Sequence, residues 1–202
     1  NNSYGKNLIG SFMQPDLVIS DVEFLKSLPK REIICGYGEI LKHSIINSKN
    51  SFKFLDKNLN KILSLKTPFI EKAITQSCKT KINIVEKDEN EKNLRKILNL
   101  GHTFAHAYEA TFSFSKKLNH GEAVILGISS SANFSLKNKI ISKKDYDLIL
   151  NHLKKIGISL NLKNYFKKKN INMIIKYMKS DKKNSIFNIN LILIKNIGKL
   201  VL

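Results

Sequence analysis

The spacing of apolar residues between Pro29 and Gly157 constrains the fold of this chain more than any other feature. Apolar side chains recur there mostly every three or four positions, which places them on one face of an α-helix. Pro29 and Pro68 each suit the first turn of a helix, and Gly157 suits the residue that follows a last turn. The expected helices span about 29–46, 52–63, 68–85, 101–112, 122–136 and 145–157. The pattern therefore predicts a mainly α, multi-helical domain.

Two short runs of β-prone residues lie outside this helical region. The run at 17–19 reads Leu-Val-Ile and is followed by the turn-forming pair Ser-Asp, which is typical of a buried strand. The sequence NINLILIK at 188–195 is the second run, and a turn is expected at Gly198. A single strand is not stable alone. We therefore expect a strand at each end of the helical domain, and a chain that is a fragment or a processed product.

The composition is that of a globular protein without a membrane span. Hydrophobic residues make up 42% and charged residues 25% of the 202 positions. The longest apolar runs, such as 124–128 and 191–194, are far shorter than the ~20 residues of a spanning helix. The first residues do not have the pattern of a secretory signal, and two cysteines, Cys35 and Cys78, cannot make a disulfide framework. We expect a reducing, cytoplasmic compartment.

The net charge of +19 suggests a nucleic-acid partner, but the residues that produce it favour another explanation. Lysine supplies 33 of the 35 basic residues, and the two arginines are Arg31 and Arg95. Arginine is the usual residue for reading phosphates and base edges. Lysine, asparagine and isoleucine share A- and T-rich codons, so codon bias accounts for a solvated, lysine-rich surface. A functional basic face stays open as the alternative.

Three histidines suggest a metal centre. His102, His106 and Glu109 are spaced to line one face of a helix, and two imidazoles four residues apart can hold one Zn²⁺. Histidines without any metal are the alternative. A third histidine, His120, follows Asn119, which can cap a helix. Catalytic zinc typically takes three protein ligands and leaves a fourth position for water or substrate.

Glu39 is the natural oxygen donor for such a centre. It lies among apolar neighbours in the pattern, and a buried carboxylate needs a partner. The alternative is that Glu39 pairs with Lys42, one turn further along the same helix.

Several charged and polar residues precede His102 and are expected near its helix start: Lys81, Glu91, Arg95 and Asn99. Arg95 stands out because only two arginines occur in a lysine-rich chain. A bidentate contact with a carboxylate or phosphate is one that lysine makes poorly.

The chain resembles the 3-dehydroquinate synthase family of sugar phosphate cyclases. The matching stretches are GKNLIGSFMQP, LKSLPKREIICGYGEILKH, KINIVEKDENEKNLRKILNLGHTFAHAYEA, LNHGEAV and MKSDKKN, in the family's order and over nearly the whole chain. The resemblance implies the family's helical C-terminal domain at 29–202. It also implies that 1–28 is the short end of the N-terminal α/β dinucleotide-binding domain, whose Gly-rich loop is missing here.

The resemblance assigns roles to particular residues. It implies zinc, or Co²⁺, bound by Glu39, His102 and His120, and it makes His106 a proton-transfer or hydroxyl-binding residue. Residues matching positions that bind the substrate's carboxylate, phosphate or hydroxyls are Lys42, Lys81, Glu91, Arg95, Asn99, Lys182 and Asn7. What remains of the NAD site matches Lys6, Phe24, Leu25, Lys26 and Ser27.

The family's reaction converts 3-deoxy-D-arabino-heptulosonate 7-phosphate to 3-dehydroquinate in the shikimate pathway. It proceeds by oxidation at C5 with bound NAD, loss of phosphate, reduction, ring opening and ring closure. Because the nucleotide half is missing, we expect no turnover by this chain alone. The resemblance also implies a homodimer.

Two positions depart from the family's pattern: Ala105 replaces a usual glycine, and Gly38 replaces a usual alanine. A methyl group at 105 adds bulk between the paired histidines but leaves the ligands intact.

Three alternatives stay open. One is a cyclase for another sugar phosphate, and another is a non-catalytic, lysine-rich binding protein. The third is a metal-dependent alcohol dehydrogenase of related fold, in which an aspartate is more usual at position 39.

Overall fold

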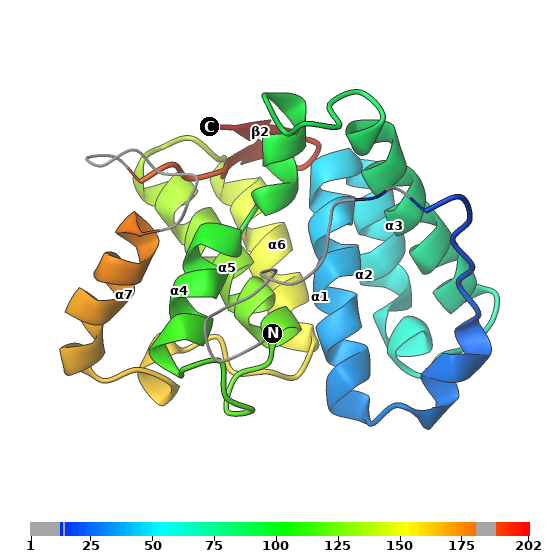
Figure 1. The fold of residues 1–202 in the computed structure, drawn as a ribbon, viewed down its shortest axis with the longest axis horizontal. Helices are drawn as coiled ribbons and strands as arrows, with labels where there is room; N and C mark the ends of the chain where they lie inside the picture. The colour runs from blue at the N-terminus through cyan, green and yellow to red at the C-terminus, as the bar shows by residue number, and fades with distance from the viewer. Residues whose placement is uncertain (1–12, 14, 181–188) are drawn as a thin grey trace.

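The computed structural model describes residues 13, 15–180 and 189–202, and within them the molecule is built almost entirely from helices (Figure 1). Seven α-helices follow one another along the described part of the chain. Their bounds are α1 (Lys30–Asn47), α2 (Lys49–Leu63), α3 (Phe69–Val85), α4 (His102–Thr111), α5 (His120–Lys137), α6 (Lys143–Lys155) and α7 (Ile171–Lys179). Short 3-10 helices lie before and between them. Those that matter below are η1 (Val22–Ser27), which precedes α1, and η2 (Leu94–Asn99), which lies between α3 and α4. The predicted mainly α class is confirmed.

Helix α5 is the centre of the fold because it is apolar on nearly every side. Residues 123–126 and Ile128 are fully buried, and α5 packs against α1, α4, α6 and the C-terminal hairpin. Helices α2 and α3 pack on the far side of α1, and α7 packs on the outer side of α4 (Figure 1). The core is therefore a continuous apolar cluster that runs through both helical groups.

A buried polar network fixes α6 against α1 and α2. His152 is fully buried, and its Nε2 lies 2.8 Å from the hydroxyl of Tyr37 while its Nδ1 lies 2.9 Å from Oδ1 of Asp56. Lys155 donates to the same Asp56 oxygen at 2.8 Å. Burial lowers the pKa of His152, although the adjacent Asp56 opposes that shift. The imidazole thus acts as a hydrogen-bonded core residue.

The helix bounds follow the apolar pattern and the capping residues. Pro29 and Pro68 precede α1 and α3, as expected. Helix α5 begins two residues earlier than predicted, at His120, because Glu122 accepts a hydrogen bond from the backbone N–H of Asn119 at 2.9 Å. That shift places His120 in the first turn of a rigid helix.

The strand predictions are confirmed in part. The C-terminal run forms β1 (Leu193–Asn196), which pairs antiparallel with β2 (Lys199–Val201) through the expected turn at Gly198, where φ is +94°. The Gly198 N–H donates to the Ile45 carbonyl at 2.8 Å, so the hairpin is tied to α1. Part of the predicted run, at 188, lies outside the described residues.

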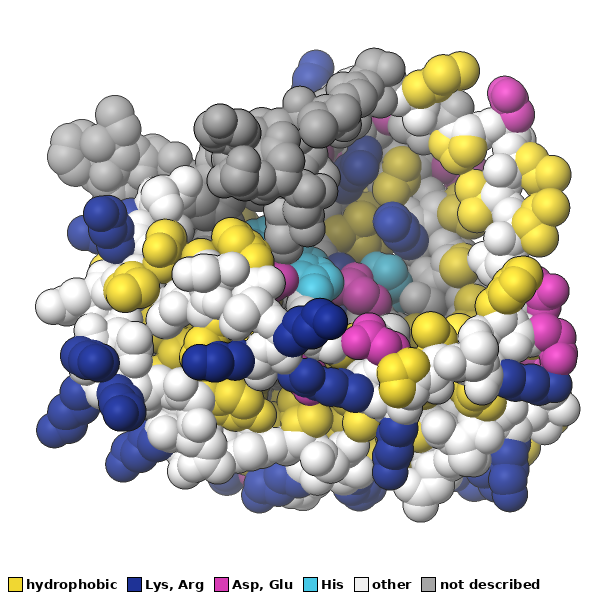
Figure 2. Space-filling model, turned by 60° about the horizontal axis from the view of Figure 1, so that its bottom comes forward, with side chains coloured by type: hydrophobic (Ala, Val, Ile, Leu, Met, Phe, Trp, Pro, Cys, Tyr) yellow, Lys and Arg dark blue, Asp and Glu magenta, His cyan; other side chains and the backbone are white. Residues whose placement is uncertain are grey.

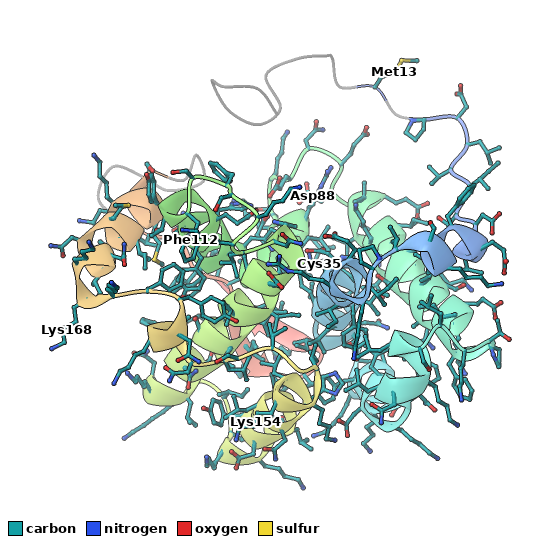
Figure 3. The ribbon with its side chains drawn as sticks, turned by 90° about the horizontal axis from the view of Figure 1, so that it is seen from below. Met13, Cys35, Asp88, Phe112, Lys154 and Lys168 are labelled. Atoms are coloured by element: carbon teal, nitrogen blue, oxygen red, sulfur yellow. The ribbon has the colours of Figure 1, made fainter. Side chains whose placement is uncertain are left out.

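The prediction of a buried strand at 17–19 is wrong. Leu17, Val18 and Ile19 are 73–80% exposed and pair with nothing, since the described part of the chain contains no strands besides β1 and β2. An apolar run becomes a buried strand only when a neighbouring sheet receives it. Figure 3 shows Met13, just before this run, well away from the helices.

Helix α7 was not predicted from the sequence. Ile171, Ile174, Ile175 and Met178 have the i, i+3, i+4, i+7 spacing of an amphipathic helix, so the signal was present in the sequence but was overlooked. Ile174 packs against the core and Met178 is buried, whereas Ile171 and Met173 are exposed.

Among the described residues, no helix combines the length and the apolarity needed to cross a bilayer.

Candidate metal centre

Three helices bring Glu39, His102 and His120 together. Glu39 lies in the middle of α1, and the two histidines are the first residues of α4 and α5. Oε1 of Glu39 is 3.4 Å from Nε2 of His102 and 3.9 Å from Nε2 of His120. One donor atom from each residue lies within 4.8 Å of the others. Donors 2.0–2.2 Å from a tetrahedral zinc ion are roughly 3.3–3.6 Å apart. The Glu39–His102 pair already has this spacing, and the wider separations would have to shorten for a cation to be held by all three.

The two carboxylate oxygens of Glu39 have different surroundings. Oε2 accepts a hydrogen bond of 2.6 Å from the buried ammonium of Lys42, so the expected pairing one turn along α1 is present. Oε1 is buried, and the described residues give it no hydrogen-bond donor. A buried oxygen without a donor is costly unless a cation meets it. The pairing with Lys42 and a role as metal donor are therefore compatible.

Electrostatics keep this cluster in the state that binds a cation. Burial raises the pKa of Glu39, but the charge and hydrogen bond of Lys42 outweigh it and hold that pKa below its usual value. Burial, with the charge of Lys42, lowers the pKa of His102 to about 3. An ionised carboxylate and a neutral imidazole are the forms that coordinate metals.

The second ring nitrogen of each histidine has its own partner. Nδ1 of His102 lies 3.2 Å from the backbone carbonyl of Leu100, and Nδ1 of His120 lies 3.0 Å from Oε2 of Glu109. Both contacts suit an Nδ1–H donor, which leaves the Nε2 lone pair directed at Glu39. Glu109 was expected on the same helix face as His102 and His106, but its contact with His120 was not foreseen.

His106 lies beside this cluster. Its ring centroid is 5.4 Å from that of His102 and 6.2 Å from that of His120. The i, i+4 spacing on α4 had suggested a His102–His106 ligand pair, whereas the donors that converge on Glu39 come from His102 and His120. Figure 2 shows histidine side chains in a hollow of the surface with acidic side chains next to them.

The polar residues expected before His102 form an ordered loop. Asn99 donates to Oε1 of Glu91 at 2.7 Å, and both line a pocket together with Lys96 and Thr103. The Asp88 carboxylate, labelled in Figure 3, accepts backbone hydrogen bonds from residues 92, 93 and 95. The Arg95 guanidinium donates to the carbonyl of Glu89. These contacts fix the loop from within.

The remaining residues that were predicted for the substrate and NAD sites lie in α3 and η1 or outside the described residues. Lys81 is an exposed residue of α3. Phe24, Leu25, Lys26 and Ser27 belong to η1, where Phe24 is 75% exposed and Lys26 pairs with Glu23 at 2.6 Å. Lys6, Asn7 and Lys182 lie outside the described residues.

Arg31 holds the start of α5, a role that sequence reasoning missed. Its Nε and Nη2 each donate to a different oxygen of Glu122 at 2.7 Å, and Nη1 donates to the carbonyl of Lys116 at 2.9 Å. Glu122 in turn accepts a hydrogen bond from the backbone N–H of Asn119, the residue directly before His120. The arginine is 91 residues from Glu122 in sequence, so no local pattern signals the contact.

Close glycine contacts set the distances between the helices that carry the donors. A Cβ at Gly121 of α5 would lie 2.1 Å from the carbonyl oxygen of Cys35 on α1. A Cβ at Gly127 would lie 2.1 Å from the carbonyl oxygen of Gly101, just before α4. Figure 3 places Cys35 at the junction of α1 with the rest of the bundle.

The two departures from the family pattern fit this packing. A Cβ at Gly38 would meet the carbonyl oxygen of Gly121 at 2.8 Å, and Ala105 is fully buried without displacing either histidine donor.

Comparison with known proteins gives the relationship. Residues 36–184 match the family model of the 3-dehydroquinate synthase C-terminal domain, and residues 1–35 match that of the N-terminal domain. The chain belongs to the 3-dehydroquinate synthase family. It is 60% identical over 198 residues to the 3-dehydroquinate synthase of Pelagibacter ubique (strain HTCC1062), covering 98% of this chain and 54% of that protein. It is 40% identical to that of Thermodesulfovibrio yellowstonii, covering 99% and 55%.

Solved structures share the fold. A 2-deoxy-scyllo-inosose synthase complexed with carbaglucose-6-phosphate, NAD+ and Co2+ has a TM-score of 0.83 and 25% identity, covering 100% of this chain and 55% of that one. A 2-epi-5-epi-valiolone synthase from Streptomyces hygroscopicus with NAD+ and Zn2+ bound has a TM-score of 0.83 and 18% identity, covering 96% and 53%. The chain thus spans about half the length of the family members it matches.

Proposed function

We propose that this chain is the metal- and substrate-binding part of a 3-dehydroquinate synthase. Such an enzyme converts 3-deoxy-D-arabino-heptulosonate 7-phosphate to 3-dehydroquinate and phosphate. The observation that carries the proposal is the convergence of Glu39, His102 and His120, with Glu39 Oε1 buried and lacking a donor among the described residues. The names of the relatives, at 60% and 40% identity, favour this substrate. The activity belongs to the longer protein, since the chain spans about half of each relative.

Glu39, His102 and His120 would hold Zn²⁺, with Co²⁺ as an alternative ion, and leave one coordination position for substrate. A bound zinc ion supplies Lewis acidity, which acidifies a substrate hydroxyl and polarises a ketone. Lys42, fixed by its 2.6 Å contact with Glu39, places an ammonium charge next to this position. The substrate's hydroxyl groups thus meet a rigid, preorganised site.

His106 is suited to proton transfer because its ring lies next to both proposed histidine ligands. An imidazole is the side chain that most often accepts and returns a proton in catalysis. Glu91 and Asn99 form a hydrogen-bonded pair on the wall of a neighbouring pocket, where they can orient hydroxyl groups. Lys81, Arg95 and Lys182 are proposed to meet the carboxylate and phosphate, and Asn7 a further polar group.

The described residues of this chain do not by themselves form an NAD site. Phe24 and Lys26 belong to η1, which has no buried residue and therefore no cradle for a nucleotide. We propose that NAD binds mainly to a nucleotide-binding half that the longer relatives contain, with Lys6 and residues 24–27 at its edge. We therefore expect no turnover by the 202-residue chain alone, even with zinc added.

The domain boundary is proposed between residues 28 and 29, because α1 begins at Lys30 as one continuous helix. We further propose that the full-length enzyme is a cytoplasmic homodimer that binds neither membrane nor nucleic acid. On this proposal, most of the +19 net charge comes from solvent-exposed lysines without a specific role, and a few basic residues contact the anionic sugar phosphate.

The decisive experiment is metal analysis of the purified chain and of two variants, Glu39→Gln and His120→Ala. We expect zinc near one equivalent per chain in the wild type and a large loss in both variants. His43→Gln is the matched control. His43 is also a buried histidine, one turn beyond Glu39 on α1, but its Nδ1 contacts Ser77 at 2.7 Å and it is not one of the converging donors. Full zinc content in both donor variants would refute the site.

A cyclase for another sugar phosphate is the second candidate, because solved structures of such cyclases share the fold. The full-length enzyme assayed with the heptulosonate phosphate and with glucose 6-phosphate separates the two. Turnover of the hexose phosphate alone would replace the first proposal by the second.

A further inference from the structure

A buried carboxylate outside the proposed donor set contacts one of its histidines. Glu109 lies near the end of α4, and 4% of the residue is exposed. Its Oε2 is 3.0 Å from Nδ1 of His120. The mechanism proposed above assigns Glu109 no contact with substrate. Because burying a carboxylate is costly unless it accepts good hydrogen bonds, this contact requires an explanation.

We propose that Glu109 is the positioning residue for His120 at the metal centre, an inference that rests on the proposed function. By accepting the Nδ1–H, the carboxylate keeps the Nε2 lone pair unprotonated and directed toward Glu39, 3.9 Å away. It also makes the imidazole a stronger donor to a cation. Glu109 thus acts through His120 rather than on the substrate.

The two histidines differ in how much they need such a partner. The side chain of His102 is 14% exposed, and its Nδ1 contacts the backbone carbonyl of Leu100, a partner that the local fold supplies. The side chain of His120 is 45% exposed. An exposed ring at a helix start rotates more freely than a buried one. A side-chain acceptor is therefore the contact that fixes its orientation.

The backbone around Glu109 makes this contact rigid. Its carbonyl oxygen accepts from the N–H groups of Phe112 and Phe114, at 3.1 and 2.9 Å, where the chain leaves α4 toward α5. The same residue thus shapes the turn with its backbone and reaches His120 with its side chain. Helices α4 and α5 also pack closely at the other end of α4, where a Cβ at Gly127 would lie 2.1 Å from the Gly101 carbonyl oxygen.

The test is the zinc Kd of the 202-residue chain, measured by competition with a chelator. Glu109→Met removes the acceptor at similar length, and Glu109→Gln keeps an uncharged acceptor in case the first variant does not fold. The matched control is Tyr108→Phe. Tyr108 is the neighbouring buried residue of α4, and its hydroxyl lies 2.8 Å from Oγ of Ser130 on α5 without touching a proposed ligand.

We expect the zinc Kd to rise about 10- to 100-fold in Glu109→Met, the range typical for loss of such a partner, and less in Glu109→Gln. Tyr108→Phe should stay within about twofold of the wild type, although it also loses a hydrogen bond between the same helices. Long-range ¹⁵N spectra of the metal-free chain should show His120 shifting from one ring tautomer to a mixture in Glu109→Met.

The outcomes separate this inference from the proposed function. A wild-type chain that binds no zinc would overturn both. Normal zinc binding by the wild type together with an unchanged Kd in Glu109→Met would overturn the positioning role alone. An equal loss in Tyr108→Phe would also overturn it, since general loosening of α4 against α5 would then account for the effect.

Discussion

Replacing Gly121 by alanine should separate α1 from α5 and damage the proposed metal centre. The new Cβ would lie 2.1 Å from the carbonyl oxygen of Cys35 and 2.3 Å from its Cα, where ordinary contact begins at 3.4 Å. Both atoms belong to a helix backbone, so no flexible side chain can move aside. The two helices must therefore separate locally by about 1 Å.

The expected cost has a structural and a functional part. Overpacking in a core typically costs 1–3 kcal/mol, and a backbone clash belongs at the upper end, so we expect a loss of about 3 kcal/mol in the free energy of unfolding. His120 precedes Gly121, and Glu39 lies one turn beyond Cys35. Their 3.9 Å separation increases with the helix displacement, and we expect the zinc Kd to rise at least about tenfold.

Gly36→Ala is the matched control on the facing helix. A Cβ at Gly36 would have nothing within 4 Å, and the residue lies inside α1. Alanine should therefore stabilise the chain by about 0.5–1 kcal/mol through helix propensity, with an unchanged zinc Kd. Urea unfolding followed by circular dichroism and chelator competition measure both quantities. The reasoning fails if Gly121→Ala unfolds at the wild-type midpoint and binds zinc as the wild type does.

Three further outcomes follow from contacts described above. Arg31→Lys removes the two-pronged contact with Glu122 and should lower the free energy of unfolding by about 1 kcal/mol in urea titrations; an unchanged midpoint would contradict this. Burial and the charge of Lys42 lower the pKa of His43 to about 4 in the folded chain. Between about pH 4 and 6.5, His43 is therefore protonated in the unfolded chain but not in the folded one. Stability should therefore fall by up to about 3 kcal/mol as pH drops from about 6.5 to 4, and His43→Gln should flatten that fall. Finally, the net charge of +19 means that positive side chains repel one another in the folded chain, and salt screens that repulsion. Raising the salt concentration from about 0.01 to 0.15 M should therefore raise the Tm. A decrease would indicate that attractive ion pairs dominate.

The helical part of the fold could be predicted because each helix carries its own periodic signal. Helices α1 to α6 lie close to their predicted positions, since apolar spacing and residues such as Pro29 and Pro68 act locally. Helix α7 carries the same periodicity over a shorter segment, which sequence reasoning overlooked. The run at 17–19 depends on a sheet that the described residues do not contain. The local sequence pattern therefore predicts where helices lie better than it predicts which neighbouring segments bury an apolar run.

The site is different because its geometry depends on contacts between distant helices. Spacing alone suggested His102 with His106, which share α4, whereas the donors nearest Glu39 come from two helices. Residue reasoning had named Glu39 and His120 as further candidates, and the family resemblance selected them with His102 and set His106 aside. The contact of Arg31 with Glu122 and that of Glu109 with His120 bring together side chains whose meeting depends on how whole elements pack.

The distribution of the proposed donors over three helices also bears on how the chain acquires its metal while folding. His102 and His120 begin consecutive helices, so the two imidazoles can meet once α4 and α5 pack against each other. Glu39 joins them only when α1 packs against this pair. A partly folded chain would present two imidazoles without the carboxylate. Copper and nickel bind nitrogen ligands at least as readily as zinc does. On the proposed function, the packing of α1 would therefore also help to select the metal, because it brings the oxygen donor to the two imidazoles.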